Sequence, residues 1–379
     1  MSDTAYPSVN DLTLEEKASL TSGGDAWHLQ GVETKGIPGY MITDGPHGLR
    51  KSLASSTGET DLNDSVPATC FPPAAGLSSS WNPELIHKVG EAMAEECIQE
   101  KVAVILGPGV NIKRNPLGGR CFEYWSEDPY LAGHEAVGIV AGVQSKGVGT
   151  SLKHFAANSQ ETDRLRISAN ISQRALREIY FPAFEHIVKE AQPWTIMCAY
   201  NCINGVHAAQ DRWLLTDVLR DEWGFQGIVM SDWGADHDRV ASLNAGLNLE
   251  MPPSYTDDQI VYAARDGRIQ PAQLDRMAQG MIDLVNKTRA AMSVENYRFD
   301  IEAHDEVAHQ AAVESMVLLK NDDAILPVAG DAKVAVIGEF ARTPRYQGGG
   351  SSHITPTKMT SFLDALTERG VDAKFAPGF

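Results

Sequence analysis

Gly227-Ile-Val-Met-Ser-Asp-Trp-Gly-Ala235 is the stretch on which the fold assignment rests. Its apolar run, Ile228 to Met230, follows a glycine and has the composition of a buried strand. The run ends in Ser-Asp-Trp, so a carboxylate stands beside a large aromatic ring where the strand finishes. Asp232 is then either a cap for the next helix, because aspartate is common there, or a carboxylate held rigidly so that it faces a pocket. The rest of the chain favours the pocket.

Strand-like and helix-like segments alternate along the chain. The predicted strands cover residues 40–44, 102–106, 150–155, 194–200, 228–230 and 247–251. Helices are predicted from about Asn82, from Tyr130, after Ser172 and after Asp211. Pro182 predicts a kink or a break in the third helix near Phe181. This alternation predicts an α/β fold with a parallel sheet, and the size favours a (β/α)8 barrel or a close relative. A doubly wound open sheet is the alternative, although no G-x-G-x-x-G follows the first strand.

Polar side chains gather where the predicted strands end. In such barrels the active site lies at the carboxyl ends of the strands. The side chains that can converge there are Asp44, Lys153, His154, Tyr200 and Asp232. Residues 107–129 form a long segment after one strand, and loops of that length are usually functional or disordered. Its aromatic residues favour an ordered loop, and residues 51–68 are predicted to form another loop.

Composition narrows the classes of partner. The 379 residues are 43% hydrophobic and 22% charged, which is ordinary for a globular protein. The net charge of −18 disfavours binding to nucleic acid or to an anionic membrane. Neither a secretory signal nor an apolar run of ~20 residues is visible. The five cysteines lack the spacing of a zinc site. We therefore expect a cytoplasmic protein with reduced thiols, no metal and no cofactor.

The chain divides into three parts. Residues 1–290 are predicted to form the barrel, and residues 291–320 a linker with a connecting helix from about Ala308 to Lys320. Lys333-Val-Ala-Val-Ile-Gly338 begins a second α/β unit, which occupies residues 321–379. The glycine-rich stretch 346–352 resembles a phosphate cradle only superficially, since no Lys-Ser/Thr follows it. One βαβ is too little to bury its own sheet. We expect a continuation or a companion fragment to complete it, and a homo-oligomer is left open.

Six motifs occur in an order that matches a known family. They are Thr43-Asp-Gly-Pro-His-Gly-Leu-Arg50, Gly119-Arg-Cys-Phe-Glu-Tyr-Trp-Ser-Glu-Asp-Pro129, Lys153-His-Phe-Ala-Ala-Asn158, Gln160-Glu-Thr-Asp-Arg164, Met197-Cys-Ala-Tyr-Asn201 and Val229-Met-Ser-Asp-Trp-Gly234. Together they closely resemble family 3 of the glycoside hydrolases, of the β-glucosidase type. The resemblance spans nearly the whole chain. It implies an N-terminal (β/α)8-like barrel followed by the start of an α/β sandwich domain.

The resemblance also implies a retaining mechanism with Asp232 as the nucleophile. In that chemistry a carboxylate attacks the anomeric carbon, and an acid ~5–5.5 Å away protonates the departing oxygen. By the same resemblance the glucosyl unit is bound by Asp44, Arg120, Lys153, His154, Met197, Tyr200 and Trp233. Asp44 would accept hydrogen bonds from two hydroxyls, and Arg120 and Lys153 would donate. Trp233 would pack along the sugar ring.

Plainer interpretations exist for several of these residues. Arg120 with Glu123 or Glu127 could be a structural salt bridge, and Lys153-His154 a surface pair. Arg114, Glu127 and Asp128 are assigned to holding the long loop. The sequence departs from the family at Asn248, where relatives often carry aspartate. The family's acid/base glutamate is expected beyond Phe379, because neither Glu339 nor Glu368 stands in a motif typical of that acid.

The leading hypothesis is a cytoplasmic β-glucosidase acting on small or oligosaccharide β-glucosides. A β-N-acetylglucosaminidase of the same family is disfavoured, because its Lys-His-Phe-Pro-Gly-His stretch is replaced by Lys153-His-Phe-Ala-Ala-Asn158. A β-xylosidase is disfavoured, because those relatives carry a larger acid where Asp44 stands. The remaining alternative is a sugar-binding barrel without turnover.

Overall fold

A computed structural model describes residues 6–53, 65–347 and 349–378 of the chain. Residues 54–64 of the predicted loop 51–68 lie outside the described residues. No helix of the described part is long and apolar enough to cross a bilayer.

A curled parallel sheet forms the centre of the larger unit. Its strands are β1 (Met41–Asp44), β3 (Val102–Leu106), β4 (Gly149–Phe155), β6 (Thr195–Cys198) and β9 (Ile228–Ser231). They are hydrogen-bonded in that order, and each pair is parallel. All residues of these strands are buried, which explains their near-continuous apolar composition. The predicted α/β fold with a parallel sheet is confirmed.

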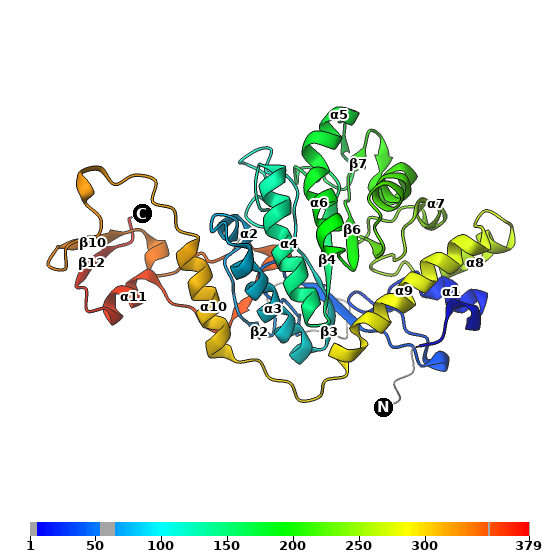
Figure 1. Ribbon diagram of the computed structural model, residues 1–379, viewed down its shortest axis with the longest axis horizontal. Coiled ribbons are helices and arrows are strands. Elements are labelled where there is room, and N and C mark those ends of the chain that lie inside the picture. The colour runs from blue at the N-terminus through cyan, green and yellow to red at the C-terminus, as the bar shows by residue number, and fades with distance from the viewer. Residues whose placement is uncertain (1–5, 54–64, 348, 379) are drawn as a thin grey trace.

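Helices cover the outer face of this sheet. Figure 1 shows α3 (Pro83–Glu100), α4 (Pro129–Ser145) and α6 (Pro182–Ala191) side by side in front of the strands. Asn82 caps α3 by accepting from the N–H of Leu85, and Asp128 caps α4 by accepting from Tyr130. The helix α9 (Pro271–Met292) contributes Met281 and Ile282 to a second apolar cluster, which also contains strand residues such as Val104.

The predicted break near Phe181 is present. Ser172 caps α5 (Gln173–Ala175), as predicted, and a π-helical turn, η3 (Leu176–Tyr180), follows. The helix resumes as α6 at Pro182, a residue that lacks the N–H needed inside a helix. Asp211 accepts from the N–H of Leu214 at 3.2 Å, next to the π-type helix η5 (Trp213–Glu222).

Isolated bridges, rather than further strands, join the two edges of the sheet. Met230 bridges to Leu249 and Glu250 to Ser22 in the parallel sense, whereas the bridges Gly23–Leu29 and His28–Met41 are antiparallel. The eight-stranded (β/α)8 barrel is therefore not confirmed, since the sheet has five strands. The strand predicted at 247–251 is reduced to bridges. It lies between Gly246, whose φ is +116°, and Pro252, and its backbone pairs in two directions, Leu249 with Met230 and Glu250 with Ser22.

Several further elements complete the barrel unit and its connections. The helices are α1 (Leu14–Ser19), α2 (Ala74–Leu77), α7 (Arg239–Ala245) and α8 (Asp257–Arg265), with 3-10 turns η1 (Val9–Asp11), η2 (Glu33–Lys35) and η4 (Ala208–Gln210). The short strands β5 (Ser168–Ala169), β7 (Cys202–Ile203) and β8 (Val206–His207) form a separate small sheet.

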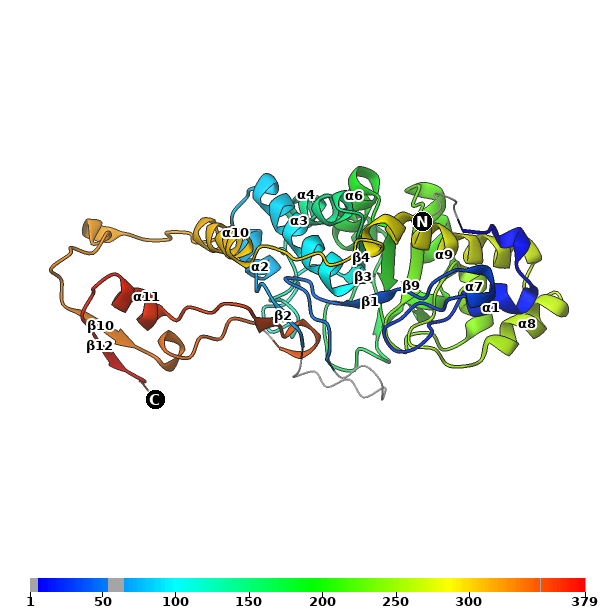
Figure 2. The same cartoon turned by 90° about the horizontal axis from the view of Figure 1, so that it is seen from below.

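The C-terminal part is a small unit. α10 (Ile301–Glu314) packs on α3, and β10 (Val334–Ile337) pairs with β12 (Ala373–Ala376) beside α11 (Phe362–Glu368). β11 (Thr355–Pro356) pairs with β2 (Pro67–Ala68) of the larger unit, and the remaining turns are η6 (Asp322–Ala324), η7 (Glu339–Ala341) and η8 (Gly350–Ser352). Figure 2 shows β10, β12 and α11 at one end of an elongated molecule.

The connecting helix differs from its predicted bounds of 308–320. It begins at Ile301, because Asp300 caps it by accepting from the N–H groups of Glu302 and Ala303. It ends at Glu314, before the apolar run 316–319 that suggested a longer helix. Apolar side chains in a short run do not distinguish a helix from an extended segment.

Candidate active site

A cavity of ≈ 180 Å³ opens at the carboxyl ends of the parallel strands. Its lining contains every predicted site residue: Asp44, Arg120, Lys153, His154, Met197, Tyr200, Asp232 and Trp233. Asp44 is the last residue of β1, Lys153 and His154 belong to β4, Met197 to β6, and Asp232 directly follows β9. The carboxyl ends of parallel strands meet at one edge of a sheet, which is how residues far apart in the sequence come together.

Asp232 is a buried carboxylate with one oxygen left unpaired. The residue is 8% exposed, and its Oδ1 accepts from the N–H of Trp233 at 2.8 Å. Its Oδ2 has no hydrogen-bond partner among the described residues and lies 3.7 Å from Nε2 of His154. Burial raises the pKa of Asp232, while Arg120, the Trp233 N–H, Lys153 and Arg164 act to lower it. Asp232 does not cap the next helix: Asp238 caps α7 instead, accepting from Val240 and Ala241.

Asp44 is the second carboxylate of the cavity. Its Oδ2 lies 3.6 Å from Nη1 of Arg50, and its Oδ1 lies 4.0 Å from Nζ of Lys153. Burial raises the pKa of Asp44, and Lys153, Arg50 and Arg120 oppose that effect. Burial has the larger effect, so the pKa of Asp44 lies above its ordinary value, and the three cations limit the shift.

A buried hydrogen-bond chain orients His154. Asn158 donates to the hydroxyl of Tyr124 at 3.0 Å, and that hydroxyl lies 3.1 Å from Nδ1 of His154. The Tyr124 hydroxyl accepts from Asn158 and can donate its own hydrogen to Nδ1, which leaves the proton of a neutral ring on Nε2, toward Asp232. Burial lowers the pKa of His154, and Arg120 and Lys153 lower it further, so the ring is neutral at neutral pH.

Arg120 combines the two roles that the sequence left open. Its Nε donates to Oε1 of Glu123, a carboxylate that is 3% exposed, so the structural salt bridge exists. Arg120 also lines the cavity. Burial raises the pKa of Glu123, but Arg120, Lys153 and His47 outweigh it, and the pKa lies below its ordinary value. Glu123 thus stays charged and holds Arg120 in place.

Three lining residues were missed from the sequence: Trp27, Arg164 and Ser351. Arg164 ends the motif Gln160-Glu-Thr-Asp-Arg164, lies 4.9 Å from the centre of the Tyr200 ring and pairs with Glu161 at 2.7 Å. Trp27 stands in a loop without periodicity. Ser351 comes from the glycine-rich stretch 346–352 and reaches the cavity only through the packing of the C-terminal unit. The motif at residues 160–164 could have identified Arg164 as a site residue. Trp27 and Ser351 stand in no motif that could have done so.

The described residues contain no group of His, Cys, Asp or Glu side chains placed to hold a metal ion. The polar groups of the cavity are instead carboxylates, cations, an imidazole and a hydroxyl beside an indole ring. These groups suit a small ligand rich in hydroxyls, with one apolar face. Fold and cavity together define an α/β protein with a sugar-sized site at the carboxyl ends of its strands.

Comparison with known families narrows this class. The chain belongs to family 3 of the glycosyl hydrolases: the family model for the N-terminal domain matches residues 49–284, and the model for the C-terminal domain matches residues 316–375. Some of the relatives are named beta-glucosidases. The thermostable beta-glucosidase B of Acetivibrio thermocellus is 51% identical over 96% of this chain and 48% of its own length.

Two relatives at the same identity carry different names. An exo-alpha-(1->6)-L-arabinopyranosidase of Bifidobacterium breve is 87% identical over 100% of this chain and 51% of its own length. A crystal structure of a Bifidobacterium adolescentis GH3 beta-glucosidase is also 87% identical, with a TM-score of 0.94 over 99% of this chain and 54% of that one. The chain thus spans about half the length of the curated relatives it matches.

Proposed function

We propose that this chain carries the nucleophile and the sugar subsite of a retaining glycoside hydrolase. The observation that supports the proposal best is the unpaired Oδ2 of Asp232, a buried carboxylate in a cavity of ≈ 180 Å³. A cavity of that size suits one pyranose ring. Burial raises the pKa of Asp232 above its ordinary value, and Arg120, Lys153 and Arg164 oppose that shift, which favours the ionised form that a nucleophile requires.

In the proposed reaction Asp232 attacks the anomeric carbon, and the bond from that carbon to the departing oxygen breaks. The departing oxygen takes a proton from an acid, or leaves as an anion where it is stable enough. Water then attacks the same carbon, releases the sugar and restores the Asp232 carboxylate. Two inversions at one carbon give net retention.

The other residues of the cavity would bind the sugar before and during these steps. Asp44 accepts hydrogen bonds from hydroxyls, while Lys153 and Arg120 donate to them, and charge-assisted bonds of this kind are the strong ones. Nε2 of neutral His154 donates as well. Trp233 offers its ring to the apolar face of the sugar, and Met197 closes one side of the cavity.

The leading substrate class is a terminal β-D-glucoside. An α-L-arabinopyranoside is a second candidate, because an 87% identical relative bears that name. The two sugars share the orientation of the anomeric bond and of the hydroxyls at C2 and C3. They differ at C4, and the arabinoside lacks the hydroxymethyl group at C5. One nucleophile can therefore serve both, and groups near C4 and C5 would discriminate between them.

Covalent trapping tests the nucleophile. A 2-deoxy-2-fluoroglucoside with a good leaving group should label Asp232, because fluorine slows both steps while the leaving group keeps the first one feasible. Asp232→Asn should abolish both labelling and turnover while keeping the shape of the cavity. A label found on another carboxylate by peptide mass analysis would refute the assignment. Sugar binding without any labelling would favour the non-catalytic barrel.

A panel of nitrophenyl glycosides tests the substrate. The β-D-glucoside and the α-L-arabinopyranoside should be cleaved in preference to the β-D-xyloside and the N-acetyl-β-D-glucosaminide. Cleavage of the xyloside or the glucosaminide first would replace the proposed substrate class with one of the two disfavoured ones.

A further inference from the structure

Trp27 and Trp233 form an aromatic pair in the lining of the cavity. Their ring centroids are 5.3 Å apart, with an angle of 37° between the planes. The indole N–H of Trp233 donates to the carbonyl of Ala26 at 2.9 Å, so the ring of Trp233 is fixed against the chain beside Trp27. The two residues come from opposite ends of the barrel sequence, and no sequence motif links them.

The loop that carries Trp27 is held at both of its sides. The carboxylate of Asp25 accepts from the N–H groups of Trp27 at 2.7 Å and of His28 at 2.8 Å. On the C-terminal side the carbonyl of Trp27 accepts from the N–H of Ile42 in β1 at 2.8 Å. On the N-terminal side the chain continues through Ser22, which bridges to Glu250.

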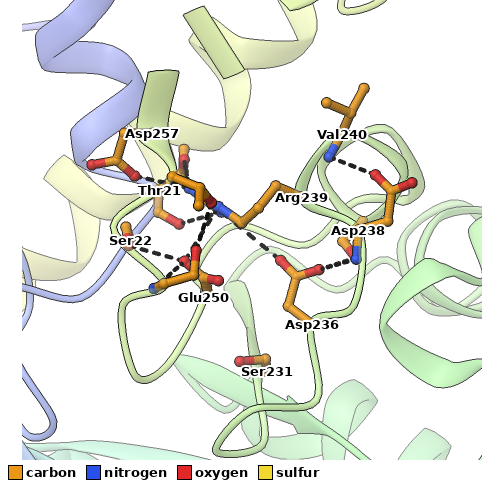
Figure 3. A network of polar contacts seen from close by, with 12 residues as sticks. Thr21, Ser22, Ser231, Asp236, Asp238, Arg239, Val240, Glu250 and Asp257 are labelled. Carbon is orange, nitrogen blue, oxygen red and sulfur yellow. Dashed lines mark hydrogen bonds and ion pairs between the residues drawn. The ribbon is translucent and has the colours of Figure 1, made fainter. Parts of the chain in front are cut away.

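At that N-terminal side Arg239 contacts Thr21, Glu250 and Asp257, and this group of contacts is called the seam. Figure 3 shows its guanidinium between Thr21, Glu250 and Asp257, with Asp236 beside it. Nη1 donates to the carbonyl of Thr21 at 3.1 Å, and Nη2 donates to its hydroxyl oxygen at 3.2 Å. Nε lies 3.2 Å from Glu250, and Nη2 lies 3.2 Å from Asp257.

The seam is buried, so its contacts are strong and geometrically demanding. Arg239 is 5% exposed, Glu250 4% and Thr21 1%. Asp236, whose Oδ2 is 3.9 Å from Nη1, adds a third carboxylate around one cation. Removing one member of a buried charged group leaves its partners unpaired. The planar fork of arginine fits several acceptors at once, and a lysine ammonium does not.

The position of Arg239 in the chain connects this seam to the cavity. It follows Asp232 and Trp233 in the same segment, whose backbone is tied to residue 251 by the bond from the N–H of Gly234 to the carbonyl of Met251. Arg239 therefore joins the segment of Trp233 to the segment of Trp27 at Thr21, in addition to the bond from Trp233 to Ala26.

We infer that Trp27 extends the aromatic wall of the sugar site and that Arg239 is the positioning residue that holds Trp27 against Trp233. The inference rests on the proposed function and adds two residues to the site. A preorganised wall contributes to sugar affinity in the ground state and the transition state alike, so its loss raises KM and leaves kcat nearly unchanged.

Kinetics of three variants on 2,4-dinitrophenyl glucoside test the inference. Trp27→Ala should raise KM roughly three- to tenfold. Arg239→Lys should raise KM by a smaller factor, with kcat and the pH profile preserved. The double variant with Trp27→Ala and Arg239→Lys should have the same KM as Trp27→Ala alone, because the effects of residues that act through one contact are not additive. Additive effects on KM, or a fall in kcat at constant KM, would overturn the inference.

A spectroscopic readout makes the test independent of turnover. Two indoles at this distance couple and give an exciton band in the far-ultraviolet circular dichroism, and the described residues contain no second pair of tryptophan rings in contact. Arg239→Lys should weaken the band. The matched control is Arg265→Lys, which alters an exposed arginine–carboxylate pair with Glu15 and should leave the band unchanged.

An unchanged band in Arg239→Lys would refute the positioning role, whatever the activity of the chain. If that variant fails to fold, Thr21→Val replaces it, since valine removes the hydroxyl acceptor of Nη2 while keeping the shape. Thr21→Val should weaken the band in the same direction. A full-strength band in a folded Thr21→Val would likewise refute the role.

Discussion

Two aspartates of the cavity share burial but differ in their partners. Asp44 has Arg50 and Lys153 within 4.0 Å of its oxygens, whereas Oδ2 of Asp232 has no hydrogen-bond partner among the described residues. A carboxylate held between two cations suits binding, and an unpaired oxygen suits attack on carbon. Burial raises the pKa of both, and the shared cations Arg120 and Lys153 oppose it at both.

Asp44→Ala should lower binding and turnover together. The substitution removes acceptors for sugar hydroxyls, and each charge-assisted bond is worth roughly 1.5–3 kcal/mol. We expect kcat/KM for an aryl glucoside to fall by about 10- to 100-fold per bond lost. Asp44→Asn should lose less, because the amide still accepts one hydrogen bond. Steady-state kinetics of the three proteins measure the order.

The matched control is Asp128→Asn. Asp128 caps α4 outside the cavity, and asparagine caps a helix as well as aspartate does. Its kinetics should equal those of the unmodified chain. An unchanged kcat/KM in Asp44→Ala would remove Asp44 from the sugar site.

Residues at strand ends were the predictable part of the site. Asp44 and Asp232 each stand two residues after the last apolar residue of a short run, and Lys153 lies in the predicted strand 150–155, so the alternation of strands and helices placed them at one edge of the sheet. Trp27 was missed because its loop shows no hydrophobic periodicity. Ser351 was missed because its place in the cavity lining depends on how the C-terminal unit packs. Propensity acts locally, whereas such contacts are set by tertiary packing.

At the scale of elements, the parallel sheet and its helices were predictable from the sequence. The isolated bridges that join the two edges of the sheet were not. Buried strands give continuous apolar runs, which β3 and β9 have. The bridges at Ser22, Leu29 and Leu249 occupy single residues, and one residue produces no pattern. The buried contacts of Arg239 with Thr21 and Glu250 add side-chain contacts to the backbone bridge between Ser22 and Glu250.

α10 is attached to α3 through His304. Nδ1 of this buried imidazole lies 2.9 Å from Glu96, and Nε2 lies 3.2 Å from Glu95, with Lys146 also paired to Glu95 and Tyr297 close to it. Burial lowers the pKa of His304, but the two carboxylates outweigh it, and the pKa lies above the ordinary value of 6.5. The charged ring therefore stabilises the folded contact.

The attachment of α10 should weaken as the pH rises. A raised pKa in the folded state gives stabilisation that is complete below pH 6.5 and is lost as the pH rises through the folded-state value. Hydrogen exchange of the α10 amides should show protection that falls as the pH rises above 6.5, after correction for the intrinsic rate. In His304→Gln this dependence should disappear.

His87→Gln is the matched control for that experiment. His87 lies on α3, where its Nδ1 is 3.9 Å from Glu91 of the same helix. The pH dependence of α10 should persist in this variant. Persistence in His304→Gln as well would show that another group controls the contact.

At the scale of the whole molecule, an apolar strip remains exposed on residues 313–328. Its exposed fractions run from 43% to 91% in Val313, Met316, Val317, Leu318, Leu319, Ile325, Leu326 and Val328. Contiguous apolar surface of this kind marks an interaction site or an aggregation liability. By contrast, Leu117 is equally exposed at 91% but stands alone in the loop 107–129.

The chain should therefore self-associate through this strip. Leu319→Lys should raise the monomer fraction, because a charge at the most exposed position opposes burial of the strip. Leu117→Lys, with the same change at equal exposure, should have no effect. Sedimentation velocity over a range of concentrations measures both. Equal behaviour of the two variants would show that the strip does not mediate association.

The cavity also lacks an evident second catalytic group. Among the described residues that line it, the carboxylates are Asp44 and Asp232. Burial raises the pKa of Asp44 above its ordinary value, but its oxygens lie within 4.0 Å of Arg50 and Lys153, and we assign it to binding the sugar. Glu339 is paired with Arg342 and does not line the cavity. Among these carboxylates we assign none to protonate the leaving oxygen.

The chain alone should therefore discriminate strongly by leaving group. General acid catalysis is worth about 10²- to 10⁴-fold, so cellobiose should be barely cleaved, whereas dinitrophenyl glucoside, whose leaving group needs no proton, should lose far less. The glycosyl-enzyme should accumulate, because no base activates water, and azide should release it as a β-glycosyl azide. Rapid-quench mass analysis follows the intermediate. Efficient cleavage of cellobiose by the 379-residue chain would place an acid within it, and the assignment of Asp44 to binding alone would be wrong.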